Sequence, residues 1–142
     1  MSEIVNNQRK IQVEIEDFQM FVEKTIETVP EAKGKSATIA FVSDRKMCEL
    51  NKTFRGKRAT TDVLSFPFEA DEFEADGENN LGDIIISLEQ AERQAKENNL
   101  AFELEIKQLI LHGVLHLCGY DHETDAGEMN EIELRLREEL GI

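Results

Sequence analysis

The sequence predicts an α+β fold in which helices pack on one small mixed β-sheet. Two patterns support this prediction: short runs of β-branched and apolar residues alternate with segments whose apolar residues recur every three or four positions. The length agrees with it, because a chain of 142 residues forms one domain and buries roughly 70% of its unfolded surface without disulfides. Residues 1–142 are therefore expected to form a single domain.

The first segments of the chain predict a strand followed by a helix. Ile4 and Val5 favour a short first strand, and Ile11 and Val13 are further candidates for it. From about residue 14 to residue 29 the apolar side chains fall on one helix face, which carries Ile15, Phe18, Phe21, Val22, Ile26 and Val29.

A second strand and a second helix are expected next. The β-branched run at 37–42 has the length of a strand. Ser43 and Asp44 form a good N-cap for a helix that continues to about Phe54. The end of this helix places residues 55–58 in a turn. One side of the helix carries Met47, Leu50 and Phe54.

The second half of the chain predicts two more strands and three more helices. Residues 60–67 begin with polar side chains and continue as a strand, in which Pro67 favours the edge of a sheet. The acidic run from Glu69 to Asn80 is typical of a loop without a function of its own. The remaining segments are a strand at 81–86, a helix capped by Ser87 that reaches about Asn98, a helix at about 102–117 and a last helix at about 125–140.

All three histidines of the chain lie between His112 and His122. The spacing of His112 and His116 places their imidazoles on the same helix face, where one divalent ion can bridge them. Gly119 allows the chain to turn, so that His122 returns as a third ligand. Three protein ligands leave one position of a zinc ion open, which is typical of catalytic sites. The nitrogen-rich set favours zinc over calcium or magnesium, although nickel and iron also accept it.

Zinc with an open position lowers the pKa of its bound water from about 15.7 to about 7, which suits phosphodiester and peptide hydrolysis equally. Position 113 separates the two reactions. Zinc peptidases with the motif His-Glu-x-x-His use the glutamate as general base, and Gly113 stands in its place. Glycine inside a helix costs roughly 1 kcal/mol relative to alanine, so something other than helix stability must favour a glycine at position 113. Room for a substrate and close helix packing explain it equally well.

The net charge of −14 conceals a basic segment. Between Lys33 and Arg58 eight basic residues oppose two acids, so this segment carries +6 and the rest of the chain −20. Such a segment binds phosphates locally while the acidic body repels polyanions elsewhere, although an ordinary solvated face explains the composition as well. Within the segment, Arg55 is the candidate phosphate ligand, because a guanidinium forms two parallel hydrogen bonds to phosphate and stabilises charge developing there.

Three aspartates near these motifs have two explanations each. Asp62 and Asp83 either hydrogen-bond a ligand imidazole or cap strand ends. Asp121 either orients water or a histidine, or belongs to the turn. Cys118 lies about 200° around the helix from His116, so we expect it to face the core instead of the metal.

The chain carries no pattern of export or membrane insertion. Its N-terminus lacks a basic start and an apolar run, and no stretch approaches the ~20 apolar residues of a membrane span. Two cysteines are too few for a disulfide framework and agree with a reducing compartment. We therefore expect a cytoplasmic protein without membrane contacts.

Four motifs follow one another along the chain: Leu50-Asn51 with residues 54–57, residues 61–67, residues 81–86 and residues 112–122. In order and spacing they closely resemble the signature of the YbeY family of bacterial rRNA maturation factors and endoribonucleases. The resemblance implies a metalloprotease-like (metzincin-like) zinc helix, a zinc ion held by His112, His116 and His122, and cleavage of single-stranded RNA. It also implies processing of the 3′ end of small-subunit rRNA, ribosome quality control, and a place for Arg55 at the RNA-facing site.

The leading hypothesis is a zinc-dependent endoribonuclease that acts on single-stranded rRNA and the ribosome, with Arg55 and His112 as catalytic residues. A competing hypothesis is a ribosome-binding assembly factor whose zinc mainly stabilises the fold. Peptidase activity is disfavoured by Gly113. The sequence leaves open the cleavage site, the general base, the choice between water and the ribose 2′-hydroxyl as nucleophile, and the oligomeric state.

Overall fold

The structure is a computed structural model that describes residues 2–68, 79–121 and 126–142. Residues 69–78 of the predicted acidic loop and the predicted ligand His122 lie outside the described residues. No helix in the described ranges combines the length and the apolar character that crossing a membrane requires. The elements in chain order are β1 (Glu3–Asn6), α1 (Ile15–Thr28), β2 (Ser36–Val42), α2 (Asp44–Arg55), β3 (Val63–Pro67), β4 (Asn80–Ser87), α3 (Leu88–Glu97), α4 (Phe102–Leu117) and α5 (Glu128–Leu140).

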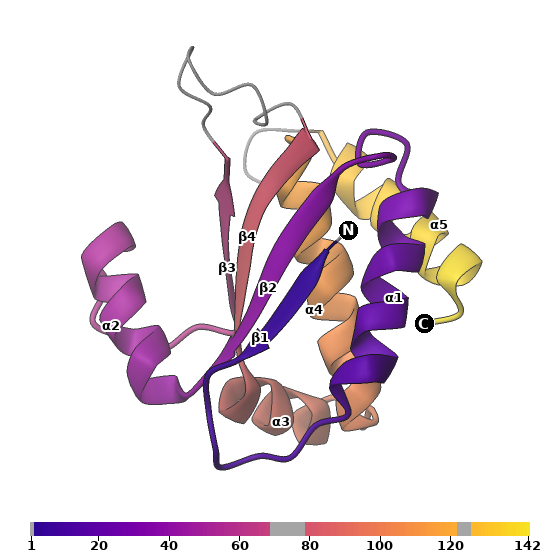
Figure 1. The fold of residues 1–142 in the computed structure, drawn as a ribbon. Coiled ribbons are helices and arrows are strands. Elements are labelled where there is room, and N and C mark those ends of the chain that lie inside the picture. Colours follow the sequence, from indigo (N-terminus) through magenta and orange to yellow (C-terminus); the bar gives the residue numbers. More distant parts are fainter. Residues whose placement is uncertain (1, 69–78, 122–125) are drawn as a thin grey trace.

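The four described strands form one sheet in the order β1, β2, β4, β3 (Figure 1). β1 runs parallel to β2 and β2 parallel to β4, whereas β3 runs antiparallel to β4. The predicted mixed sheet is therefore confirmed. Pro67 lies on the edge strand β3, as expected, because a sheet edge tolerates the missing N–H of proline.

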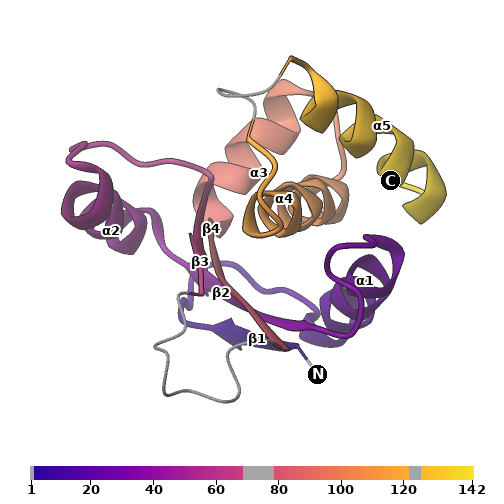
Figure 2. The same cartoon turned by 90° about the horizontal axis from the view of Figure 1, so that it is seen from above.

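Helices cover both faces of this sheet. α1 and α4 pack on one face and α5 packs outside them, whereas α2 lies on the opposite face (Figure 2). The alternation of side chains along β4 builds both interfaces. Ile84 and Ile86 enter the large core with α1 and α4, and Ile85 packs against the smaller cluster of Val42, Met47 and Leu64.

Predicted capping residues set the start of two helices. Ser43 Oγ accepts a hydrogen bond from the Lys46 N–H at 3.2 Å, and Ser87 caps α3 in the same way. α2 ends at Arg55 because Gly56 adopts the left-handed conformation, with φ of +70°. The cap at Ser43 and the glycine at position 56 therefore place Arg55 at the C-terminal end of α2.

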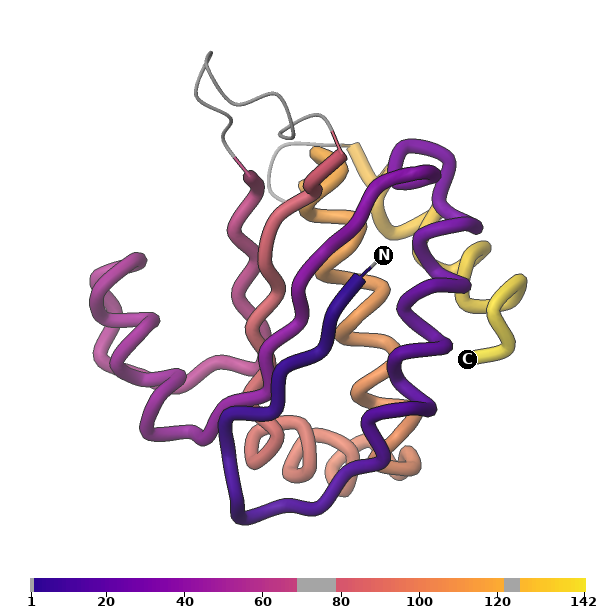
Figure 3. Tube along the Cα trace, viewed as in Figure 1, coloured from indigo at the N-terminus to yellow at the C-terminus, as the bar shows by residue number. Residues whose placement is uncertain are grey.

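The stretch before α1 is a loop, so Ile11 and Val13 do not extend the first strand. The side chain of Gln8 occupies both backbone groups of Ile11, accepting from its N–H at 2.9 Å and donating to its carbonyl at 2.7 Å. Figure 3 shows the segment leaving the end of β1 and returning to the start of α1. Ile11 and Val13 pack against the large core from this loop, which explains their apolar character.

Asp44 joins α2 to the rest of the fold. Its carboxylate accepts hydrogen bonds from Ser87 Oγ at 2.6 Å and Thr60 Oγ1 at 3.0 Å, and Arg93 Nη2 donates to the second oxygen at 2.5 Å. Burial by itself raises the pKa of Asp44, but the hydrogen bonds from Ser87, Arg93 and Thr60 outweigh it and hold that pKa below its usual value. An ionised Asp44 therefore connects the start of α2 to β4 and α3.

We expect Asp44→Asn to lower the free energy of unfolding by about 1–3 kcal/mol at neutral pH, because a charge-assisted hydrogen-bond network loses its acceptor. The pKa of Asp44 is lowered in the folded state. Its contribution is therefore present above the unfolded-state pKa of about 3.9 and is lost as the pH falls through the folded-state pKa. Urea unfolding at several pH values should show the difference between wild type and variant shrinking below about pH 4. A constant difference would contradict this account.

Candidate active site

α4 carries two of the predicted metal ligands, His112 and His116. Their Nε2 atoms lie 3.0 Å apart and their ring centroids 4.5 Å apart, as the spacing of four residues predicts. Much of the remaining surface of α4 is buried in the large core through residues such as Ile106, Ile110 and Val114. Rotating the helix would expose this apolar surface, so packing holds both imidazoles toward one point.

A carboxylate from the last helix holds His112. Glu133 of α5 is buried, and its Oε1 lies 3.2 Å from His112 Nδ1. Since an ionised carboxylate only accepts hydrogen bonds, His112 donates through Nδ1–H, and the lone pair of the neutral ring lies on Nε2, facing His116. Arg137 Nη2 lies 3.6 Å from the same Oε1 and balances its charge. A carboxylate in this position is typical of metal-binding histidines.

Glu133 is a site residue that the sequence interpretation missed. It shares the buried face of α5 with Met129, Leu136 and Leu140, where helical periodicity predicts an apolar residue. A charged residue on a buried helix face was the available signal, because buried charges in proteins are paired. The identity of its partner, His112, required the structure.

The geometry of the two described histidines fits a metal ion. Two nitrogen ligands about 2.0–2.1 Å from a tetrahedral zinc ion lie about 3.3 Å from each other, close to the 3.0 Å between these Nε2 atoms. Within residues 2–68, 79–121 and 126–142, no group of three or more His, Cys, Asp or Glu side chains is arranged to hold a metal. The described residues therefore supply two nitrogen ligands, and His122 stays a prediction.

The chain turns after α4, as the sequence predicted. Gly119 has a φ of +97°, and its N–H donates to the carbonyl of His116 at 3.0 Å. Cys118 packs against the large core, also as predicted, and burial raises the pKa of its thiol to about 11. Gly119 and Tyr120 line the same pocket as His112 and His116.

The two histidines line a cleft of about 570 Å³ between α4 and the edge strand β3. Arg55 reaches the same cleft from the end of α2, so the structure brings together Arg55, His112 and His116. Asp121, two residues after Gly119, also lines the cleft. The other lining residues are Val63, Leu64, Ser65, Pro67, Gly119 and Tyr120.

Gly113 faces the sheet. A Cβ atom at this position would lie 2.8 Å from Cγ2 and 3.0 Å from Cδ1 of Ile84 on β4, which is closer than side chains pack. Of the two explanations for this glycine, close packing of α4 on the sheet accounts for it.

The two aspartates considered as partners of an imidazole differ from each other in their surroundings, and Asp62 lines a pocket together with His112 and Glu133. Asp62 Oδ1 accepts a hydrogen bond from the Val63 N–H at 2.8 Å, which caps the start of β3. Asp83 is exposed in β4. The carboxylate on His112 comes instead from Glu133 of α5, the third helix after β4 in chain order.

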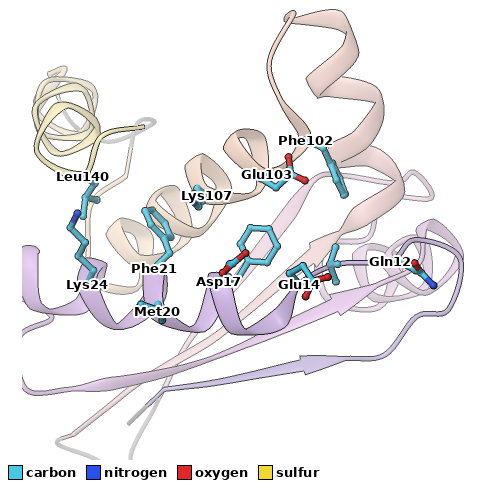
Figure 4. A pocket seen from close by; sticks show the side chains of 12 residues that line it. Gln12, Glu14, Asp17, Met20, Phe21, Lys24, Phe102, Glu103, Lys107 and Leu140 are labelled. Atoms are coloured by element: carbon cyan, nitrogen blue, oxygen red, sulfur yellow. The ribbon is translucent and has the colours of Figure 1, made fainter.

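A larger cavity of about 740 Å³ lies between α1 and α4 and shares no lining residue with the cleft. Figure 4 shows its mixed lining, with Phe21 near Lys107, whose Nζ lies 5.6 Å from the ring centroid. Neither Arg55 nor the two described histidines lie in this cavity. Choosing a site by cavity volume alone would therefore have selected a cavity without the predicted metal ligands.

Known proteins of one family match this chain along nearly its whole length. The sequence profile of the family described as Endoribonuclease YbeY matches residues 3–141. A protein named endoribonuclease YbeY from Alkaliphilus metalliredigens is 41% identical, with the match covering 100% of this chain and 97% of the relative. A protein of the same name from Thermodesulfovibrio yellowstonii is 36% identical, covering 97% of this chain and 96% of the relative.

The fold gives the same result. The solution structure of a protein from Thermotoga maritima resembles this one with a TM-score of 0.67 at 31% sequence identity, covering 99% of this chain and 89% of that one. Because the sequence profile, the relatives and the fold agree over the same residues, the chain belongs to the endoribonuclease YbeY family.

Proposed function

We propose that this chain is a zinc-dependent endoribonuclease that cleaves single-stranded RNA in the cytoplasm. The observation that carries the proposal is one cleft in which His112 and His116 converge at 3.0 Å and which Arg55 also lines. A metal ligand pair and a guanidinium facing the same space suit a phosphodiester, because its charge needs cations on more than one side. Membership of a family described as endoribonucleases supports the same reaction.

In this proposal His112, His116 and His122 hold the ion. Zinc, when bound, supplies positive charge beside the phosphate and lowers the pKa of water there. Glu133 keeps the His112 ring oriented through Nδ1, which leaves Nε2 for the metal. The His112 side chain is 27% exposed, so the site opens to a substrate in the cleft. This openness favours a catalytic ion over a structural one, since structural zinc sites are closed by four protein ligands.

The basic segment supports an approach of RNA over α2. Since α2 lies on the opposite face of the sheet from α1 and α4, its cations are separated from much of the acidic remainder of the chain (Figure 2). Such a distribution guides a polyanion to one side of an acidic protein. The basic residues of α2 and of the turn after it are Arg45, Lys46, Lys52, Arg55, Lys57 and Arg58.

Arg55→Ala is expected to lower kcat/KM for a single-stranded RNA about 10²–10³-fold, the usual loss when one oriented donor to a developing charge is removed. Arg55 is exposed, so its removal should leave the fold intact. Lys52→Ala is the matched control, because it removes the same charge from α2 outside the cleft, and it should retain most of the activity. Equal rates for wild type and Arg55→Ala, in preparations free of other nucleases, would contradict the proposal.

We further propose that the physiological RNA is rRNA on the ribosome, including the 3′ end of small-subunit rRNA, and that the protein acts in ribosome quality control. The support is the resemblance of four ordered motifs to a family of rRNA maturation factors. The competing assembly-factor hypothesis gives a different result: chelation would lower the melting temperature and abolish ribosome association, while rigorously purified protein would cleave no RNA.

A further inference from the structure

Phe54 is an aromatic side chain left in solvent beside the cleft. Along one side of α2 the side chains change from fully buried Met47, through half-buried Leu50, to Phe54, which is 61% exposed. Burying a phenylalanine normally stabilises a fold, and most of that gain is unused here. The apolar pattern of α2 therefore explains Met47 and Leu50 but not the exposure of Phe54.

The ring is nevertheless held in place. Phe54 contacts Phe66 of β3 edge to face, with ring centroids 5.0 Å apart and ring planes at 62°. Phe66 itself packs against the small cluster of Val42, Met47 and Leu64. An exposed ring fixed in this way offers a flat surface to a ligand at little cost in conformational entropy.

Phe54 lies across the edge strand from the histidines. Ser65 and Pro67 of β3 line the cleft, whereas Phe66 between them points toward α2, because side chains alternate along a strand. Phe54 contacts that outward side, and its chain neighbour Arg55 lines the cleft. A strand of RNA that leaves the cleft past Arg55 and crosses the edge of β3 therefore reaches the Phe54 ring.

We propose that Phe54 stacks on an unpaired base of the RNA, next to the nucleotide whose phosphate is bound by Arg55. This rests on the nuclease function proposed above and adds a base-binding subsite to it. Stacking requires a free base face, which single-stranded RNA offers and a paired helix does not. Since every base has such a face, the subsite selects for single strands without selecting a sequence.

The charges around the ring suit this ligand. Lys57 and Arg58 follow Gly56 in the turn after α2, so cations continue along the chain beyond Arg55. Aromatic rings interspersed with cations are the usual surface for single-stranded nucleic acid, because phosphates and bases alternate along the strand. An apolar protein segment is a less suitable ligand, because it would contact the Phe54 ring without neutralising the neighbouring cations.

A tryptophan at this position would report on stacking directly. The chain has no tryptophan, so Phe54→Trp introduces a single tryptophan whose emission can be excited selectively. Rapid mixing of the metal-loaded variant with single-stranded RNA should quench its emission before cleavage proceeds, whereas duplex RNA or a strand of abasic residues should quench it little. Leu134→Trp on α5, where Leu134 is 54% exposed, is the matched control and should not respond to any of these RNAs.

Steady-state kinetics separate stacking from a structural role. Phe54→Ala should raise KM for single-stranded RNA roughly 5- to 100-fold and leave kcat within about twofold, since stacking contributes equally to substrate and transition-state binding. Phe54→Tyr should restore the wild-type KM. Phe54→Leu keeps the apolar bulk without an aromatic face, so it should behave like Phe54→Ala.

The outcomes distinguish this proposal from the nuclease function. If wild type cleaves RNA while Phe54→Ala keeps the wild-type KM and Phe54→Trp is not quenched, the subsite is wrong and the nuclease stands. If wild type cleaves no RNA but single strands still quench Phe54→Trp, the nuclease is wrong and the subsite stands. If Phe54→Ala lost binding to a partner protein but bound free single-stranded RNA as tightly as wild type, the stacking role would be wrong.

Discussion

Replacing His116 with alanine is expected to abolish both stoichiometric metal binding and RNA cleavage. The two imidazoles converge at 3.0 Å between Nε2 atoms, so removing one leaves a single described nitrogen ligand on α4. Loss of the ion removes several kcal/mol of stabilisation of the transition-state charge, which corresponds to a fall in kcat/KM of about a thousandfold or more. Metal analysis of the untagged protein and a cleavage assay on single-stranded RNA measure the two effects together.

Cys118→Ala is the matched control for His116→Ala. Cys118 lies two residues further along the chain and is itself a metal-ligand residue type, but it packs against the large core. The alanine variant should therefore keep the metal content and the cleavage rate of wild type, with a modest loss of stability. A His116→Ala protein that bound metal and cleaved RNA like wild type would show that α4 does not carry the metal site.

Replacing Glu133 with alanine is expected to weaken metal binding and activity about 10- to 100-fold, the usual effect of removing the carboxylate behind a ligand histidine. Without it, Nδ1 of His112 loses the acceptor that selects the tautomer and orientation of the ring. Glu133→Gln should lose less, because its amide oxygen still accepts from Nδ1–H. Competition with a chromogenic chelator gives the metal affinity of each variant.

Glu131→Gln provides the comparison for Glu133→Gln. Glu131 is exposed on the same helix, so this change removes the same charge without touching His112. It should leave metal affinity unchanged. Similar losses of affinity in both variants would mean that net charge matters and that the contact between Glu133 and His112 does not.

Local signals explain why much of the fold could be predicted. α4 has the predicted bounds of residues 102–117, because its apolar period is long and uninterrupted. Ser43 and Ser87 could be assigned as caps because a cap depends only on residues within one turn. The i, i+4 relation of His112 and His116 is equally local, and it gave the geometry of the pair.

Features that depend on distant parts of the chain were harder to predict. Nothing near His112 in the sequence indicates that Glu133 approaches its Nδ1, since α5 packs against α4 only in the folded protein. The meeting of Arg55 with the histidines depends on how α2 and β3 lie beside α4, and the resemblance to a known family suggested it where periodicity did not. Neither the helical periodicity nor the resemblance to a family predicted that Phe54 is exposed, because its place on the apolar side of a helix predicts burial.

The contact between Gly113 and Ile84 also bears on how such sites diverge. A glutamate at position 113, as in a His-Glu-x-x-His peptidase, would start from a Cβ atom 2.8 Å from Cγ2 of Ile84, so either the Ile84 side chain or α4 would have to shift to admit it. A substitution at position 113 alone would therefore also require a rearrangement between α4 and β4. The close spacing between helix and sheet therefore means that the two motifs differ in how tightly the metal-binding helix packs on its sheet as well as in the residue at this position.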